Sequence, residues 1–393
     1  MKNAAASRSG HRDAGPDAPL ELSPPEAWAR VRAGVPLLDV RSEGERAAGT
    51  AEGARAVALD ELLAHPAAAL PDPAQEVGLL CASGQRTARA AARLRELGHA
   101  RVWSVAGGLA RWRAEALPVT APNETPDFLE RFGRHLLLPE VGLEGQRRLR
   151  DARVALVGAG GLGSPVALYL AAAGVGHLSL IDDDRVERSN LQRQVLHGEA
   201  DIGRSKVASA ADRLAALWPG IALRQDAVRL GPGNADALLA EHDVVVDGAD
   251  NFLTRYLLSD ACVRLGLPLV HGAVDRFRGQ VALFWPARRP EAGCYRCLFP
   301  APPPAELVPN CAQAGVLGIL PGLVGMLQAT ETLKLLLGIG EPLLGTLLCV
   351  DALTMRFDRL ALHRHSDCAV CGDGRHALSS APLPGAGCGT GAP

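Results

Sequence analysis

The chain contains 393 residues, which is enough for two or three domains that each bury a hydrophobic core. Its formal net charge of −2 gives no general attraction to nucleic acid or to an anionic membrane surface, so any phosphate binding must be local. Aromatic residues make up only 4%, which argues against platforms for stacking bases. We therefore expect no nucleic-acid partner and no membrane partner.

Cysteine usage and the apolar segments indicate the compartment. The nine cysteines are an odd number, and four of them form two Cys-x-x-Cys pairs, which favours metal-binding and catalytic thiols over a disulfide framework. Residues 1–20 carry charges and lack an apolar core of signal-peptide length. The most apolar stretch, residues 314–340, contains a proline and two charged side chains, so it predicts a buried helix and not a membrane span. We expect a cytoplasmic protein.

The first half of the chain predicts a small α/β domain between two irregular segments. Residues 1–20 and 376–393 have the composition of disordered ends. Within residues 20–120, short apolar runs alternate with alanine-rich helical stretches such as residues 87–97. The expected strands are residues 37–40, 77–80 and 101–105. Residues 121–127 (APNETPD) contain two prolines that disfavour a helix, and they predict a linker.

Residues 128–375 repeat the same alternation on a larger scale. The expected strands are residues 153–157, 178–182, 243–247 and 269–271, and two strand pairs are expected around residues 280–284 and 346–350. One expected helix begins near residue 162, and the others cover residues 205–217, 252–265 and 322–337. Strands and helices in this order predict a Rossmann-like α/β fold with a mostly parallel sheet. Ligands of such sheets bind at the carboxyl ends of the strands.

A glycine-rich turn, GAGGLG, follows the first of these strands. Its glycines, Gly158, Gly160, Gly161 and Gly163, let the backbone approach a phosphate while the N–H groups of the next helix point at it. Asp182 ends the next strand, where such folds place a carboxylate for a ribose. Taken alone, this pattern is more typical of an NAD-binding unit.

The residues at the neighbouring strand ends favour a triphosphate instead. SNLQRQ supplies Asn190 and Arg193, and GRSK supplies Lys206, which are amide and cationic donors that hydride transfer does not need. Asp250 and Asn251 (DGADNF) follow another strand, and a carboxylate there can hold Mg²⁺ against phosphates. The alternative interpretation of any one of these charged residues, taken by itself, is a solvated surface side chain.

These motifs, together with the two Cys-x-x-Cys pairs, resemble the ubiquitin-activating-enzyme superfamily over residues 128 to about 372. The similarity is strongest to the molybdopterin-synthase adenylyltransferases and their thiamine-pathway relatives. The resemblance implies that the C-terminal glycine carboxylate of a ubiquitin-like sulfur carrier attacks the α-phosphate of ATP and gives an acyl-adenylate and pyrophosphate. The protein has only to position the reactants and to neutralise charge.

The resemblance also assigns roles to single residues. Asp250 becomes the Mg²⁺-linked catalytic carboxylate, and Arg134 (RFGRH) matches an arginine that this family donates across a homodimer to the partner's ATP. The implied nucleotide contacts are Gly161, Asp182, Asp184, Asn190, Arg193, Lys206, Asp250 and Asn251. Cys311 (NCAQAG) matches a cysteine that takes a carrier thioester or acyl-disulfide, and the alternative is a buried, inert thiol.

The two cysteine pairs predict a metal site. Two residues separate Cys294 from Cys297, and two separate Cys368 from Cys371, a spacing that lets both thiolates of a pair reach one ion. Together the two pairs make a closed Cys₄ set that is typical of structural Zn²⁺. The pairs are about 70 residues apart, so the metal would tie the end of the chain back to its middle. Four unrelated cysteines are the alternative.

The N-terminal region carries a second resemblance. The segments LLDVRSEGERAAGTAEGA, CASGQRT and AGGLARW resemble a rhodanese domain over about residues 20–120. Cys81 lies between a strand and a helix, where N–H groups stabilise a thiolate, and Arg86 adds a positive charge to the loop. Such a thiolate carries a sulfane sulfur as a persulfide. The segment GTAEGA departs from the family's GHIPGA, and an inactive rhodanese fold is the alternative.

The combined hypothesis is an adenylyltransferase with sulfurtransferase activity that turns a carrier's carboxylate into a thiocarboxylate, using ATP, Mg²⁺ and Zn²⁺. A persulfide donor such as a cysteine desulfurase would load Cys81. Molybdopterin synthesis is the first choice of pathway, and thiamine, cysteine and tRNA thiolation remain open. The rival hypotheses are an NAD-dependent oxidoreductase and a non-catalytic, zinc-stabilised scaffold.

Overall fold

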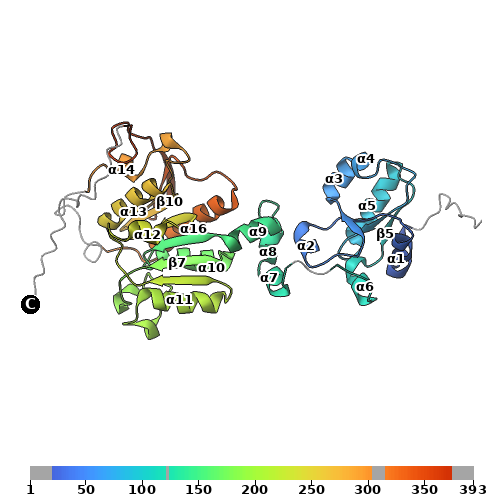
Figure 1. Cartoon of the computed structure of the whole chain (residues 1–393), viewed down its shortest axis with the longest axis horizontal. Coiled ribbons are helices and arrows are strands. Elements are labelled where there is room, and N and C mark those ends of the chain that lie inside the picture. Colours follow the sequence, from blue (N-terminus) through green and yellow to red (C-terminus); the bar gives the residue numbers. More distant parts are fainter. Residues whose placement is uncertain (1–19, 121–123, 303–314, 374–393) are drawn as a thin grey trace, which may run out of the picture. The chain divides into compact units, whose positions relative to one another are not determined.

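The structure is a computed structural model that describes residues 20–120, 124–302 and 315–373. Its contacts divide the chain into two compact units, with the boundary between Leu143 and Glu144 (Figure 1). The disorder predicted for the two ends of the chain falls outside the described ranges, apart from Leu20, and Cys311 also lies outside them.

The smaller unit contains a five-stranded sheet in the order β1-β5-β4-β2-β3, in which every pair of neighbours is parallel. The strands are β1 (Glu21–Leu22), β2 (Leu37–Asp39), β3 (Ala54–Ala56), β4 (Val77–Leu80) and β5 (Val102–Val105). The helices are α1 (Pro24–Arg32), α2 (Glu43–Ala47), α3 (Leu59–Ala64), α4 (Pro66–Ala69), α5 (Gln85–Glu96), α6 (Gly108–Ala114), α7 (Pro126–Arg131) and α8 (Gly133–Leu136). The α/β prediction is confirmed. The strands β1 and β3 were not predicted, because two or three residues are too few to show a periodic pattern.

Hydrophobic side chains of this sheet pack on both of its faces. Successive residues of a strand point to opposite faces, so Leu37 joins one buried cluster and Leu38 the other. Trp103 is also buried, and its ring fills the space beside Gly78. A Cβ atom at Gly78 would lie 2.3 Å from that ring, so glycine is required in this central strand.

The predicted linker, residues 121–127, is shorter in the structure. Residues 121–123 are outside the described ranges, and α7 begins at Pro126, with the Thr125 side chain accepting a hydrogen bond from Phe128 N. Proline is compatible with the first turn of a helix because its missing N–H would have no partner there. The second proline of the segment therefore starts a helix where the sequence analysis expected none.

The larger unit contains an eight-stranded sheet in the order β13-β12-β11-β10-β9-β6-β7-β8. Its strands are β6 (Arg153–Val157), β7 (His177–Ile181), β8 (Ala222–Asp226), β9 (Val244–Asp247), β10 (Leu269–Asp275), β11 (Arg278–Phe284), β12 (Thr346–Asp351) and β13 (Arg356–Ala361). The five strands from β10 to β8 are parallel, and β11 to β13 continue the sheet as antiparallel hairpins. The Rossmann-like, mostly parallel sheet is confirmed. The exposed strand β8 was missed because it lacks an apolar alternation, and β13 pairs with β12 in the strand pair that was expected around residues 346–350.

Helices cover both faces of this sheet (Figure 1). They are α9 (Gly142–Asp151), α10 (Gly163–Ala173), α11 (Lys206–Leu217), α12 (Ala235–Leu239), α13 (Phe252–Leu265), α14 (Tyr295–Leu298) and α16 (Ile319–Leu337), with the 3-10 turns η1 (Arg188–Asn190), η2 (Glu199–Asp201) and η3 (Pro290–Ala292). The helices α10 and α16 pack together, and α16 lies on β9, β10 and β11, whereas α13 packs on β9 and β10. The helix α16 is partly buried, and in the described part of the chain no helix is long and apolar enough to cross a membrane.

The strand order creates a topological switch point at the carboxyl edge of the sheet. The chain runs outward from β6 to β7 and β8 on one side, and β9 and β10 lie on the other side of β6. The connections after β6 and β9 therefore leave in opposite directions. In open α/β sheets, this switch point is the place where ligands bind.

Candidate functional site

The glycine turn lies at the switch point and meets the turn that follows β9. A Cβ atom at Gly158 would lie 2.5 Å from the Gly248 carbonyl oxygen, and one at Gly163 would lie 1.9 Å from the Gly158 carbonyl oxygen. Gly158 also has a φ of 96°, which disfavours any other residue. Gly160 and Gly161 are less crowded, since a Cβ atom there would come no closer than 3.6 Å and 3.1 Å to a neighbour. Gly158 and Gly163 are therefore required by the close packing of the turn, and Gly160 is the least crowded of the four.

Asp182 fixes the glycine turn through its backbone. The carboxylate follows β7 and accepts hydrogen bonds from Ala159 N and Asp184 N, both at 2.8 Å. Burial raises the pKa of the Asp182 carboxyl, although the charge of Lys206 and the two N–H groups act in the opposite direction. The predicted ribose-binding carboxylate thus also has a structural role.

Lys206 begins α11 and reaches the same edge. Its side chain is 8% exposed, and Nζ donates to Asp184 Oδ2 at 2.7 Å. The carboxylate oxygens of Asp182, Asp183 and Asp184 lie within 4.8 Å of one another and could hold a metal ion. Exposed acidic clusters are common without an ion, so this cluster does not by itself define a metal site.

The SNLQRQ segment packs against Gly161 of the glycine turn. A Cβ atom at Gly161 would lie 3.6 Å from Arg193 Cγ, and Arg193 Nη1 donates to the Ser189 carbonyl at 3.0 Å. Asn190 is buried in η1, and its side-chain oxygen accepts from Glu187 N at 3.3 Å. The structure therefore brings Arg193 to the glycine turn, while the Asn190 oxygen shapes its own loop.

Asp250 and Asn251 follow β9 at the same edge. The Asp250 side chain is exposed, and Asn251 Nδ2 donates to its Oδ1 at 3.4 Å. The Asn251 oxygen accepts from Thr254 N at 2.9 Å, so Asn251 is the N-cap of α13. Asparagine before a helical run is a recognised capping signal, and it gives Asn251 a structural role that the sequence analysis did not consider.

A buried polar cluster lies beneath this turn and was missed by the sequence analysis. It consists of Asp247, Arg255, His271 and Gln328, which come from β9, α13, β10 and α16. Each of these residues lies in or beside an apolar segment, so the sequence analysis assigned none of them to the site. Only the rule that buried charges must be paired could have drawn attention to them.

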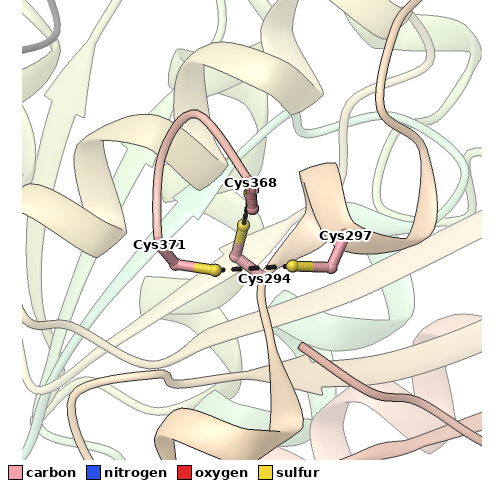
Figure 2. Close-up of side chains that lie close together, drawn as sticks. All are labelled: Cys294, Cys297, Cys368 and Cys371. Carbon is pink, nitrogen blue, oxygen red and sulfur yellow. Dashed lines mark hydrogen bonds between the residues drawn. The ribbon is translucent and has the colours of Figure 1, made fainter. Parts of the chain in front are cut away.

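The four cysteines of the predicted metal site converge, as Figure 2 shows. The Sγ atoms of Cys294 and Cys368 are 3.7 Å apart, those of Cys297 and Cys371 are 3.4 Å apart, and all four lie within 4.8 Å of one another. Tetrahedral zinc with Zn–S bonds of about 2.3 Å separates its sulfur ligands by about 3.8 Å. The four thiols therefore fit a closed zinc site, and no fifth ligand is needed.

Backbone turns on both sides of the metal site support this arrangement. Gly293 has a φ of 72°, and a Cβ atom there would lie 3.1 Å from Cys297 Sγ. A Cβ atom at Gly372 would lie 2.4 Å from the Cys368 carbonyl oxygen. His365 N also donates to Cys297 Sγ at 3.4 Å, the kind of N–H contact that orients a thiolate ligand.

In the smaller unit, Cys81 lies between β4 and α5 at the floor of a tight loop. Its Sγ accepts from Gly84 N at 3.2 Å and lies 3.3 Å from Thr87 Oγ1. Burial acts to raise the pKa of the Cys81 thiol, but hydrogen bonds from Thr87 and from the N–H groups of Ser83 and Gly84 outweigh it, and the pKa lies below its usual range. The loop stabilises a thiolate.

Arg86, at the start of α5, faces a carboxylate. Its two terminal nitrogens donate to the two oxygens of Glu45, at 2.5 Å and 3.1 Å. Hydrogen bonding to Glu45 raises the pKa of Arg86, and the Cys81 sulfur contributes in the same direction. The Arg86 guanidinium thus interacts both with the Glu45 carboxylate and with the sulfur of Cys81. Arg134 lies on α8 in this unit.

Two families match the chain. Residues 132–370 match the ThiF family, and residues 23–115 match the rhodanese-like domain. A sulfur carrier protein adenylyltransferase of Thermus thermophilus is 54% identical over 251 residues, which are 63% of this chain and 93% of the relative. A probable adenylyltransferase/sulfurtransferase, MoeZ, of Mycobacterium tuberculosis is 50% identical over 235 residues, and these cover 60% of each protein.

The fold of the larger unit also matches solved structures. A crystal structure of E. coli MccB with ATP superposes with a TM-score of 0.51 and 25% identity, covering 57% of this chain and 68% of that one. The matched family spans more than half of the sequence and includes the glycine turn, Asp250 and all but one of the four clustered cysteines. The chain belongs to the ThiF family and carries a rhodanese-like domain before its ThiF domain.

Proposed function

We propose that the ThiF domain uses ATP to adenylylate the C-terminal carboxylate of a ubiquitin-like sulfur carrier protein, and that the rhodanese-like domain then supplies sulfur to give a thiocarboxylate. The adenylylation half is supported by the contact between two turns at the switch point, which carry Gly158 and Asp250. An NAD-binding unit would use the glycine turn and a ribose-binding carboxylate such as Asp182, and it would not need Asp250. The MccB structure with ATP and the name of the Thermus relative support the same nucleotide and the same class of acceptor.

In the adenylylation step, the glycine turn and the residues around it position the triphosphate. The N–H groups at the start of α10 face the phosphates, and Lys206 and Arg193 neutralise their charge. The carrier carboxylate attacks the α-phosphorus, and the bond to pyrophosphate breaks. Arg134 is the candidate arginine donated by the partner subunit of a homodimer. These residues transfer no atoms, so positioning and electrostatics supply the rate.

In the sulfur-transfer step, Cys81 carries the outer sulfur of a persulfide. That sulfur attacks the carbonyl carbon of the acyl-adenylate, the bond to AMP breaks, and an acyl-disulfide forms. A second thiolate then attacks Cys81 Sγ, which releases the thiocarboxylate and leaves a disulfide that a cellular dithiol must reduce. Cys311 is the candidate for the second thiolate. Because the cycle needs free thiols and a persulfide donor such as a cysteine desulfurase, we propose that it runs in the cytoplasm.

Two metals complete the proposal. Mg²⁺ held by Asp250 would supply charge neutralisation at the phosphates. Zn²⁺ at the four cysteines would supply a cross-link between residues far apart in the chain, because a closed Cys₄ site has no open position for a substrate. The thiol geometry in Figure 2 supports the second assignment.

The experiment is a two-part assay of the full chain with candidate carriers. The adenylylation half predicts carrier-dependent exchange of labelled pyrophosphate into ATP. The second half predicts, after addition of a persulfide source, a carrier whose intact mass shows one oxygen replaced by sulfur, and the carrier that gives this product identifies the pathway. Binding of NAD with no exchange for any carrier would contradict the proposal.

A further inference from the structure

The end of strand β9 is held from both faces of the sheet by buried polar side chains that the proposed reaction does not use. Asp247, His271 and Gln328 have no exposed surface, and Arg255 is 8% exposed. Buried polar groups lower stability unless their hydrogen bonds are complete. Here Arg255 Nε, His271 Nε2 and Gln328 Oε1 have no hydrogen-bond partner among the described residues. Stability alone therefore does not account for this cluster.

On the α13 face, the Asp247 carboxylate joins two strands and a turn. Asp247 and His271 each follow directly on the last paired residues of β9 and β10, Val246 and Val270, and His271 Nδ1 lies 2.8 Å from Asp247 Oδ2. Burial lowers the pKa of His271, although Asp247 acts to raise it, so the ring is neutral and its Nδ1–H donates to the carboxylate. The other oxygen, Oδ1, accepts from Ala249 N at 3.0 Å.

Arg255 extends this network to the other side of the Ala249 peptide. Its Nη2 donates to the Ala249 carbonyl oxygen at 3.0 Å, and its Nε lies 3.9 Å from Asp247 Oδ2. Both the N–H and the C=O of Ala249 are therefore bound to buried, charged side chains. Ala249 immediately precedes Asp250, so the direction in which Asp250 leaves the turn is set by this pair.

On the α16 face, Gln328 binds the backbone of the same strand. Its Nε2 donates to the Asp247 carbonyl at 2.7 Å and to the Val270 carbonyl at 3.2 Å. A Cβ atom at Gly272 would lie 2.3 Å from Gln328 Cδ, so the glutamine fits only because β10 has a glycine there. Gln328 and Gly272 together hold the end of β9 on this face.

The metal site supports the network through one aromatic ring. Tyr295 lies between Cys294 and Cys297 in the chain, and its ring centroid is 5.1 Å from that of His271. The charge of Arg255 also acts on the Tyr295 hydroxyl. The first cysteine pair and the turn of Asp250 are therefore joined by a continuous set of buried contacts.

We propose that Asp247, Arg255, His271 and Gln328 are positioning residues that aim Asp250 at the triphosphate. The inference rests on the proposed adenylylation and adds to it the residues on which the geometry of Asp250 depends. A carboxylate that must meet a transition state tolerates only small displacements, and a misplacement of about 1 Å can lower a rate about a hundredfold. The cluster should therefore affect the maximal rate more than it affects ATP binding.

The test compares three variants of the full chain in pyrophosphate exchange. His271→Leu removes the donor to Asp247, and we expect kcat to fall about tenfold to a hundredfold while KM for ATP changes less than about twofold. His271→Asn keeps an N–H donor where Nδ1 stands, and we expect it to recover most of that loss. Leu258→Ala, on the same helix as Arg255 and as fully buried as His271, is the matched control for lost packing. It should lower the Tm and leave kcat unchanged. Zinc content and Tm are measured for each protein.

A kcat for His271→Leu equal to that of the unaltered chain would overturn the inference. So would equal losses of kcat in all three variants, because these would assign the effect to packing. Absence of exchange in the unaltered chain with every carrier would instead contradict the proposed adenylylation, and the inference with it. Arg255→Met provides an independent arm with the same expected split between kcat and KM.

Discussion

The two units each place a turn between a parallel strand and a helix, but the N–H groups of the two turns have different partners in the proposed reactions. After β6, a Cβ atom at Gly160 would come no closer than 3.6 Å to a neighbour, and the proposed partner of the turn is a triphosphate from outside the chain. After β4, Gly84 N and Thr87 instead converge on the sulfur of Cys81, which belongs to the chain itself. A Cβ atom at Gly108 would lie 2.3 Å from the Cys81 carbonyl oxygen, so this second loop is closely packed. Under the proposed function, backbone N–H groups between a strand and a helix bind a ligand in one unit and stabilise a nucleophile in the other.

The largest expected effect is a complete loss of sulfur transfer with no change in adenylylation. Cys81→Ala removes the only atom of the loop that can carry sulfur, so we expect no thiocarboxylate at all and unchanged pyrophosphate exchange. Intact-mass analysis of the carrier measures the first, and labelled exchange measures the second. Cys262→Ala is the control, since Cys262 is fully buried in the larger unit, and burial raises its pKa and keeps it a thiol. Normal sulfur transfer by Cys81→Ala would make the smaller unit dispensable.

Asp250→Ala should have the converse effect. We expect exchange to fall about a hundredfold to a thousandfold, because one electrostatic contact to the reacting phosphate is lost. Persulfide loading on Cys81, the zinc content and the Tm should not change. Asp212→Ala, which removes an exposed carboxylate paired with Arg204, is the control. Unchanged exchange would remove Asp250 from the mechanism.

The sequence predicted the parts of the site that follow strand ends, because a strand, a turn and a helix leave a local pattern. Asp182 and Asp250 were found in this way, and the structure places both just after the carboxyl ends of strands of the larger sheet. Arg255 and His271 were missed because their partners come from other elements, and only tertiary packing brings them together. Arg134 and Cys311 rest on the resemblance alone, since their roles depend on a partner subunit and on residues outside the described ranges.

A smaller effect distinguishes the glycines that build the first turn from those that face the ligand. Gly158→Ala introduces a Cβ atom 2.5 Å from the Gly248 carbonyl at a φ of 96°, and we expect a loss of about 1–3 kcal/mol of stability. Gly160→Ala meets no atom closer than 3.6 Å, so its Tm should stay the same while KM for ATP rises. Thermal unfolding and exchange kinetics measure the pair. An unchanged KM for Gly160→Ala would mean that this glycine does not face the nucleotide.

The smallest effect is on the pH dependence of the sulfur loop. The pKa of the Cys81 thiol is lowered, so the thiolate persists to lower pH than in an ordinary cysteine, and persulfide loading should extend to that lower pH. Thr87→Val keeps the shape and the backbone N–H but removes the hydroxyl beside Sγ. The thiolate loses stabilisation, its pKa rises, and the midpoint of the loading rate should move up by about one pH unit, or about 1.4 kcal/mol.

Ser104→Ala is the graded control for that shift. Ser104 Oγ donates to Thr87 Oγ1 at 2.8 Å and does not touch the sulfur, so its removal should move the midpoint in the same direction by less. Loading is measured as the rate at which the Cys81 peptide gains one sulfur from thiosulfate across a pH series. A midpoint that stays in place in Thr87→Val would mean that the N–H groups alone hold the thiolate. The smaller unit would then stabilise its anion through backbone donors only, whereas the proposed triphosphate site combines backbone N–H groups with Lys206 and Arg193.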